Sequence, residues 1–124
     1  MRKQSIFAGG YALLISLLLA TTISASGVMS ASSLRVTILE NDVTYEYEYD
    51  NPHHYEYEEG RHVVRGEEAK QKVLELLTLI KLNENSKIED IVRELKQHHP
   101  DIEKVDIRYM NDDNKLFTWV WHDE

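Results

Sequence analysis

The sequence contains no cysteine among its 124 residues. This absence excludes structural disulfides, thiolate metal sites and a cysteine nucleophile. It also excludes a lipoprotein, because lipid attachment needs a cysteine after the apolar segment of the signal. Catalytic patterns are lacking too, since the chain has no Gly-rich phosphate loop, no G-x-S-x-G and no H-E-x-x-H. We therefore expect neither an enzyme nor a cofactor.

Basic residues are scarce relative to acidic ones. The chain has 14 lysines and arginines against 22 aspartates and glutamates, which gives a formal net charge of −8. An acidic domain repels phosphate backbones and anionic lipid, so nucleic acid is not an expected partner. A membrane is expected to be contacted only through the N-terminal segment, if that segment is retained.

The first 26 residues have the composition of an export signal. Arg2 and Lys3 precede an uncharged apolar stretch over residues 6–23, and small residues follow at 24–26. This combination is typical of a secretory signal peptide, with cleavage expected after Ser26. The alternative is an uncleaved membrane anchor, because the stretch is at the short end of the length that spans a bilayer. Both interpretations place the rest of the chain on the same side, since basic residues stay cytoplasmic.

The remaining chain is therefore expected outside the cytoplasmic membrane, either secreted or anchored to its outer face. An exported domain without disulfides suits a Gram-positive bacterium. Residues 27–33 are small and polar and are expected to form a flexible leader. Residues 34–124 are long enough for one α+β domain with a single core.

Alternation of apolar and polar residues predicts the first strands. Residues 34–40 are rich in β-branched side chains and predict a strand. Residues 43–50 alternate strictly, with valine and tyrosines on one face and threonine and acids on the other, which predicts a second strand. Residues 55–58 repeat the pattern after an Asn-Pro turn, and we expect the two segments to form one hairpin. Residues 61–65 either continue this third strand or start another.

Helical spacing of apolar residues predicts two helices in the middle of the domain. The first is expected to begin after Gly66, with two acidic residues in its first turn, and to end near residues 83–85. Ser86 is followed three residues later by Glu89, and this capping box predicts that Ser86 is the N-cap of the second helix. Pro100 is expected to end that helix.

Two further strands complete the predicted domain. Residues 105–110 alternate, a polar turn follows at 111–114, and residues 116–121 are apolar on both faces. This last segment, LFTWVW, is typical of a well-covered strand near the centre of a sheet. The predicted fold class is therefore α+β: an antiparallel sheet of about four to five strands with two helices packed on one face, in the order β-β-β-α-α-β-β, preceded by the N-terminal hydrophobic helix.

Several short motifs follow one another along this layout. They are LRVTI at residues 34–38, a tyrosine- and acid-rich second strand, GEEA at residues 66–69 before a leucine-rich helix, a capped second helix, and a V-D-I strand before a polar turn. In these features the chain resembles the YusW-like family of small exported Bacillus proteins over residues 34–121. The resemblance implies no established activity, cofactor or catalytic residue. Members of that family carry a lipid-attachment cysteine, which this chain lacks.

The second helix and the last hairpin also resemble a known type of module. Residues 88–121 are similar to half of a PepSY-type module. Such modules are extracytoplasmic and are often linked to protease restraint. This second resemblance therefore implies a protease-restraining role.

The acidic face of the predicted hairpin is the first candidate site. Its residues are Glu46, Glu48 and Asp50, with Glu56, Glu58 and Glu59 expected across the hairpin. Like charges opposite each other destabilise a sheet, and a divalent cation such as Ca²⁺ would offset that repulsion. The alternative is a solvated outer face with Arg61 and Arg65 as counter-charges.

Six histidines form the second candidate set: His53, His54, His62, His98, His99 and His122. Neutral imidazole binds zinc, copper or nickel. Adjacent residues point apart on a strand or helix, however, so each His-His pair would offer one ligand. We therefore expect structural or solvent-exposed histidines, not a metal site.

Aromatic rows on the tyrosine-rich and C-terminal strands form the third candidate site. The candidate interaction surface consists of Tyr45, Tyr47, Phe117, Trp119 and Trp121. Such rows more often belong to the sheet core. If helices cover only one sheet face, however, one row is expected on the other face, where it would suit a peptide or glycan.

Three functions are consistent with these features. The leading hypothesis is a non-catalytic extracytoplasmic domain that contacts another protein at the cell envelope. The first alternative is a divalent-cation-binding protein that uses the acidic hairpin. The second alternative is a PepSY-like module that restrains a protease.

Overall fold

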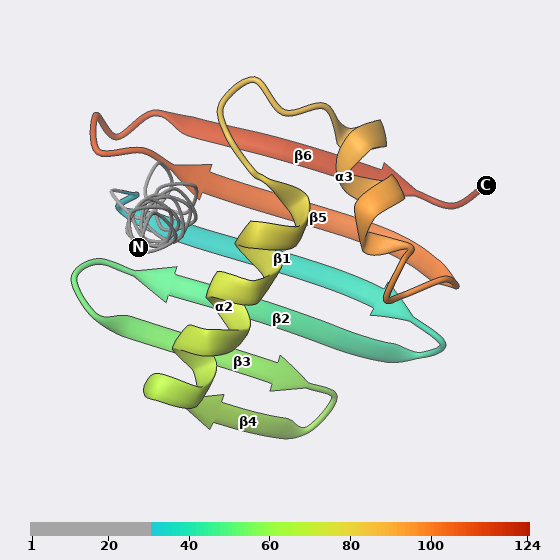
Figure 1. The fold of residues 1–124 in the computed structure, drawn as a ribbon, viewed down its shortest axis with the longest axis horizontal. Coiled ribbons are helices and arrows are strands. Elements are labelled where there is room, and N and C mark those ends of the chain that lie inside the picture. The colour runs from blue at the N-terminus through green and yellow to red at the C-terminus, as the bar shows by residue number, and fades with distance from the viewer. Residues whose placement is uncertain (1–30) are drawn as a thin grey trace, which may run out of the picture.

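Six strands form one antiparallel sheet in the computed structural model, which describes residues 31–124. The strands are β1 (Ser33–Glu40), β2 (Val43–Asp50), β3 (His54–Glu59), β4 (His62–Arg65), β5 (Ile102–Met110) and β6 (Leu116–His122). Their order across the sheet is β4-β3-β2-β1-β5-β6, as Figure 1 shows. Helices α2 (Glu67–Ile80) and α3 (Ile88–Leu95) lie between β4 and β5 in the chain. The predicted signal peptide or anchor, with its hydrophobic helix, lies outside the described residues.

The α+β class, the antiparallel sheet and the two helices are confirmed, and the strand count is corrected. The observed order is β-β-β-β-α-α-β-β, with one more strand before the helices than predicted. The extra strand is β4, which pairs with β3 and does not continue it. The reversal occurs at Gly60, whose φ of 61° lies in the left-handed region that glycine adopts without steric cost.

The last part of the predicted flexible leader belongs to the fold. Ala31 is buried, and the backbone N–H of Ser32 donates to the carbonyl of Met110 at 2.9 Å. The Ser32 hydroxyl also donates to the carbonyl of Asn111 at 3.0 Å. These contacts fix the start of β1 beside the end of β5.

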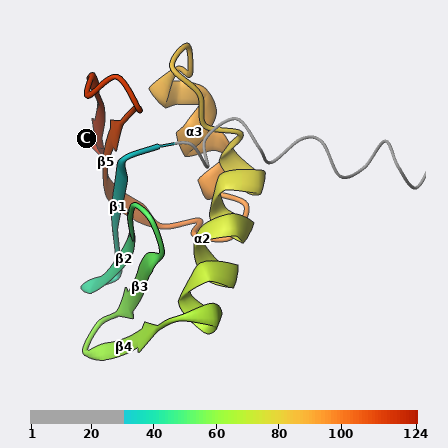
Figure 2. The same ribbon diagram turned by 90° about the vertical axis from the view of Figure 1, so that its left-hand side faces the viewer.

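The two helices cover one face of the sheet, and no helix or strand of residues 31–124 covers the other, which we call the uncovered face (Figure 2). Alternation along β1 sorts its side chains between the two faces. Leu34, Val36 and Ile38 are buried beneath the helices, whereas Arg35 is exposed and Thr37 half-buried on the uncovered face. The same alternation in β2, β3 and β5 turns their tyrosines towards the helices and most of their charged residues towards the uncovered face.

Both helices bury the apolar stripes that their sequences predict. The buried residues are Ala69, Val73, Leu76 and Ile80 on α2, and Ile91, Val92 and Leu95 on α3. Full burial of a leucine or isoleucine side chain contributes about 1.5–3 kcal/mol, so these stripes hold the helical layer on the sheet. Neither described helix combines the length and apolar content that crossing a membrane requires.

The predicted N-cap at Ser86 is wrong. Helix α3 begins at Ile88 with Lys87 as its N-cap, and no side chain caps it. The Ser86 hydroxyl instead accepts the backbone N–H of Asn83 at 2.9 Å, and the Ser86 carbonyl accepts the indole N–H of Trp119 at 2.8 Å. Ser86 therefore shapes the connection between the helices and fastens it to β6.

The prediction that LFTWVW lies near the sheet centre is also wrong. This segment forms β6, which is an edge strand and pairs only with β5 among the described strands. Phe117, Trp119 and Trp121 face the helices and are half-buried. Leu116 and Val120 point to the uncovered face and are 54% and 46% exposed. The fold therefore covers only the aromatic side of β6, and the apolar side chains on its other side remain exposed.

Candidate functional site

Four glutamates of β2 and β3 meet on the uncovered face. The register of β2 and β3 places Glu46 opposite Glu58 and Glu48 opposite Glu56. All four side chains are half-buried. We call these residues the glutamate cluster. The hairpin prediction that brought them together is confirmed.

The other acidic residues of the predicted face lie elsewhere. Asp50 is exposed and pairs with His54 at the turn end of the hairpin. Glu59 pairs with Tyr45 and lies on the helix side of β3, where it accepts the hydroxyl of Tyr57 at 3.0 Å. The charge repulsion is therefore concentrated in the glutamate cluster.

Tyrosine packing on the opposite face explains why the glutamates are forced together. The rings of Tyr47 and Tyr57 lie 4.9 Å apart and those of Tyr49 and Tyr55 4.8 Å apart, all four buried beneath α2. Aromatic pairs contribute about 0.5–1.5 kcal/mol each beyond their area. Because side chains alternate along a strand, burying the tyrosines places the intervening glutamates on the uncovered face. Burial of the tyrosines therefore fixes the strand register, and this register brings the glutamates close together.

Only half of the glutamate cluster is neutralised by neighbouring arginines. The Nε atom of Arg35 lies 3.2 Å from Glu48, and that of Arg65 lies 3.2 Å from Glu56. Among residues 31–124, no basic side chain forms an ion pair with Glu46 or Glu58. The sequence had indicated Arg65 as a counter-charge but not Arg35, which comes from β1. Arg61, the other expected counter-charge, makes no ion pair within the described part of the chain.

Proton sharing within the glutamate cluster follows from this imbalance. Hydrogen bonds with the carboxyl groups of Glu56 and Glu46, followed by burial and carboxylate repulsion, raise the pKa of Glu58 to about 7. The pKa of Glu56 is lowered, chiefly by the hydrogen bond from Glu58 and further by Arg65. Below about pH 7 the Glu58 carboxyl therefore holds a proton, which relieves the repulsion between it and the neighbouring carboxylates.

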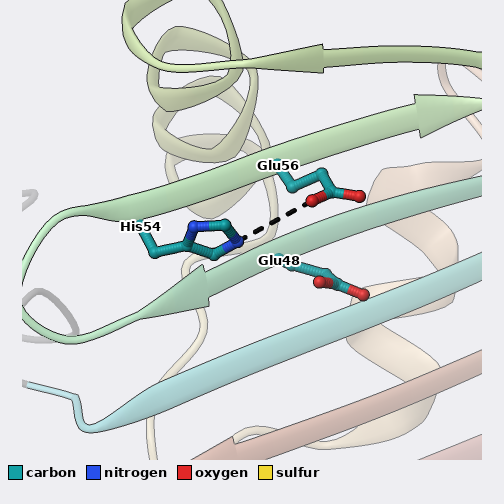
Figure 3. Close-up of side chains that lie close together, drawn as sticks. All are labelled: Glu48, His54 and Glu56. Carbon is teal, nitrogen blue, oxygen red and sulfur yellow. Dashed lines mark ion pairs between the residues drawn. The ribbon is translucent and has the colours of Figure 1, made fainter.

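One histidine joins the edge of the glutamate cluster. Ligand atoms of Glu48, His54 and Glu56 all lie within 4.8 Å of one another. Figure 3 shows these three side chains on the neighbouring strands. The Nε2 atom of His54 is 3.7 Å from a carboxylate oxygen of Glu56. Two carboxylates and one imidazole form a donor set that suits zinc or a similar divalent metal. Both carboxylates already face an arginine, however, so an ion would have to compete with the two guanidinium groups.

The sequence pattern did not predict that His54 lies beside the two glutamates. His53 and His54 form an adjacent pair in the sequence, and the acidic residues form a separate set. The signal that would have found the set is the length of the hairpin turn. A turn that pairs Asp50 with His54 places His54 on the same face as Glu48 and Glu56.

The remaining histidines do not gather at one site. His99 binds Glu40 through Nδ1 at 2.9 Å and packs on the ring of Tyr45, at the end of the helical layer. His62 lies on β4 and His122 on β6, which are the two opposite edges of the sheet. These positions fit the expectation of structural and exposed histidines.

Both candidate aromatic rows face the helices, so the expectation that one row lies on the uncovered face is not met. Tyr47 is buried and Tyr45 is half-buried against His99. Phe117 stacks with Trp119, and the ammonium group of Lys96 lies 5.1 Å from the ring centre of Trp121. The two rows lie on the same face because the strand register pairs the residues of each row with helix-facing residues of the neighbouring strands.

Comparison of the chain with protein-family models, curated proteins and solved structures gives no match. The resemblances to the YusW-like family and to a PepSY-type module therefore stay predictions from the sequence.

Proposed function

We propose that this protein is a non-catalytic exported domain that binds a basic segment of another protein at the cell envelope. The uncovered face is the proposed binding surface, and the glutamate cluster lies on its β2 and β3 strands. The observation that carries the proposal is the pairing of Glu46 with Glu58, two carboxylates that face each other without an ion-pair partner among the described residues. Export is the part of the proposal that comes from the N-terminal sequence.

Electrostatics supports a cationic partner. Opposed carboxylates destabilise the hairpin, and a lysine or arginine placed between them would remove that cost on binding. The raised pKa of Glu58 has the same cause, because a bound proton also relieves the repulsion between the carboxylates. A basic side chain would take the place of this proton. The complementary charge gives both affinity and orientation.

The shape of the surface supports a protein and not a small substrate. The uncovered face extends across six strands and no described helix crosses it (Figure 2). Arg35, Arg65 and Arg108 lie on the same face as the glutamate cluster, so the surface has a pattern of both charges. A flat surface with patterned charge recognises an extended or flat partner, whereas small ligands bind in concave pockets.

Calorimetry with oligolysine as the probe tests this proposal. We expect the protein to bind oligolysine at about pH 8, where Glu58 is mostly ionised. The double variant Glu46→Gln/Glu58→Gln should bind about tenfold more weakly, because each exposed ion pair contributes up to about 1 kcal/mol and 1.4 kcal/mol is tenfold. Acidifying the sample below pH 7 should weaken wild-type binding in the same direction.

The matched control is Glu68→Gln/Glu75→Gln, which removes the same charge from two exposed positions on α2. Its binding should equal that of the wild type. Equal weakening by both double variants would mean that only net charge matters, and absence of any heat would remove the proposal.

Divalent-cation binding is a second candidate function, and the proximity of Glu48, His54 and Glu56 favours it. The imidazole makes zinc a better candidate than calcium, which prefers oxygen ligands alone. Calorimetry with zinc chloride distinguishes the two proposals, because His54→Ala should abolish zinc binding while leaving oligolysine binding intact. The neighbouring exposed residue provides the control, His53→Ala, which should bind zinc as the wild type does. No heat from zinc would remove this candidate.

A further inference from the structure

Strand β6 lacks the features that usually protect the edge of a sheet. Exposed edges are normally short, charged, bulged or interrupted by proline, because their free backbone groups would otherwise pair with another strand. Residues 116–121 contain no charge and no proline, and β6 pairs with β5 over seven consecutive residues without a bulge. On its uncovered side, Leu116 and Val120 are the two most exposed large apolar residues of the described chain.

The opposite edge shows how this chain protects a strand. Strand β4 has four residues, begins with His62 and ends with Arg65, and is bounded by Gly60 and Gly66. Short length, polar ends and flanking turns disfavour pairing with a further strand. Strand β6 is therefore more available for pairing with a further strand than β4 is.

We propose that β6 pairs antiparallel with β6 of a second copy of this chain. Centring the pair on Trp119 aligns the whole strand, with Leu116 opposite His122, Phe117 opposite Trp121 and Thr118 opposite Val120 of the other copy. The two-fold axis is then perpendicular to the sheet, and both helical layers lie on the same side. This register continues the aromatic row across the junction on the helix side. Aromatic cross-strand pairs are among the more stabilising ones in antiparallel sheets.

The charge distribution favours a second copy at this edge. The chain carries a net charge of −8, so two copies repel each other wherever acidic surfaces would meet. From Lys115 to Trp121 the edge contains no acidic residue, which removes that repulsion along the strand. A second copy also supplies the same row of aromatic and apolar side chains, so the edge complements itself.

This inference is independent of the proposed function. The glutamate cluster lies on β2 and β3, and β1 and β5 separate it from β6 in the sheet. Pairing through β6 would leave the uncovered face of each copy accessible. A dimer would then present two acidic surfaces on one side of a continuous sheet, and binding to a repetitive basic partner would gain from avidity.

Sedimentation equilibrium of the protein, in the form that its cells produce, tests the dimer. The wild-type mass should rise from one chain towards two as the concentration increases from micromolar to millimolar. Thr118→Lys/Val120→Lys should stay monomeric, because the register places lysine opposite lysine. Both positions are exposed, so thermal unfolding of dilute samples should match the wild type. The control His62→Lys/Val63→Lys adds the same charge on β4 and should dimerise normally.

Disulfide crosslinking tests the register, because the chain has no cysteine of its own. Proteins carrying Thr118→Cys and Val120→Cys should crosslink more efficiently when mixed than either alone, since these two positions face each other across the junction. Equal crosslinking in all three samples would contradict the register. A wild type that remains monomeric throughout, or a lysine variant that dimerises as well as the wild type, would overturn the proposal and leave the edge to a strand from another protein.

Discussion

The carboxylate of Glu40 lies 2.9 Å from Nδ1 of His99, although 59 residues separate them in the chain. The other carboxylate oxygen of Glu40 accepts the backbone N–H of Asp101 at 2.9 Å. Glu40 is only 8% exposed, at the end of β1 in the centre of the sheet. One buried side chain therefore joins the segment after α3 to the central strand.

Replacing Glu40 by alanine should destabilise the protein by about 2–3 kcal/mol. The variant Glu40→Ala leaves the Asp101 N–H and the His99 ring without their acceptor in a mostly buried site, and an unsatisfied buried group costs about 1–3 kcal/mol. Urea denaturation measures the change in free energy of unfolding. The control Glu103→Ala, at an exposed position on β5, should change stability by less than about 0.5 kcal/mol. Equal effects would show that the Glu40 contacts contribute little.

Stability should depend on pH through Glu58. Its pKa is raised to about 7 in the folded protein from an ordinary value of 4.5, so between these values the folded chain holds a proton that the unfolded chain has released. Protonation of Glu58 therefore stabilises the folded state fully below pH 4.5, and this stabilisation is lost as the pH rises through 7. The lowered pKa of Glu56 acts in the opposite sense, but only as the pH falls below 4.5.

The variant Glu58→Gln removes this titration. Above pH 7 it should be more stable than the wild type by about 0.5 kcal/mol, a mid-range value for a cross-strand pair that is partly screened by solvent. The difference should shrink towards pH 4.5, where the wild type is protonated. Urea midpoints measured across this range give the result. A constant difference at all pH values would mean that Glu58 does not titrate in the folded state as described.

The indole hydrogen bond of Trp119 should stabilise the connection between the helices. Trp119→Phe removes the donor to the Ser86 carbonyl while keeping an aromatic ring, and a lost hydrogen bond costs about 1 kcal/mol. Trp121→Phe is the matched control, because it makes the same change two residues along the same face of β6 without an indole hydrogen bond to the described residues. We expect the Trp119 variant to be the less stable of the two in thermal unfolding. Equal stability of the two variants would contradict this role.

Local patterns predicted much of the fold because each pattern depends on neighbouring residues. The alternation in residues 43–50 and 55–58 correctly placed the tyrosines on one face of a hairpin and the glutamates on the other. The apolar stripes of both helices were also correct. In each case a period of two or 3.6 residues decides which side chains are buried.

Properties that depend on distant partners could not be predicted in this way. The position of β6 at the edge follows from its pairing with β5 alone, and an apolar segment has the same local pattern at an edge and at a centre. Ser86 has the sequence of an N-cap but binds Asn83 and Trp119 instead. The neutralisation of Glu48 depends on Arg35 from a neighbouring strand.

If a protein partner binds the uncovered face beside the glutamate cluster, site-specific photo-crosslinking in living cells should capture it there. Benzoylphenylalanine would replace Thr37, which lies between Glu46 and Asp106 on that face, and in a separate experiment Glu75, which is exposed on α2. We expect one discrete crosslinked protein from position 37 and none from position 75, with the adduct lost in the Glu46→Gln/Glu58→Gln background. A partner captured from position 75 alone, or an adduct from position 37 that persists without the two carboxylates, would contradict the claim.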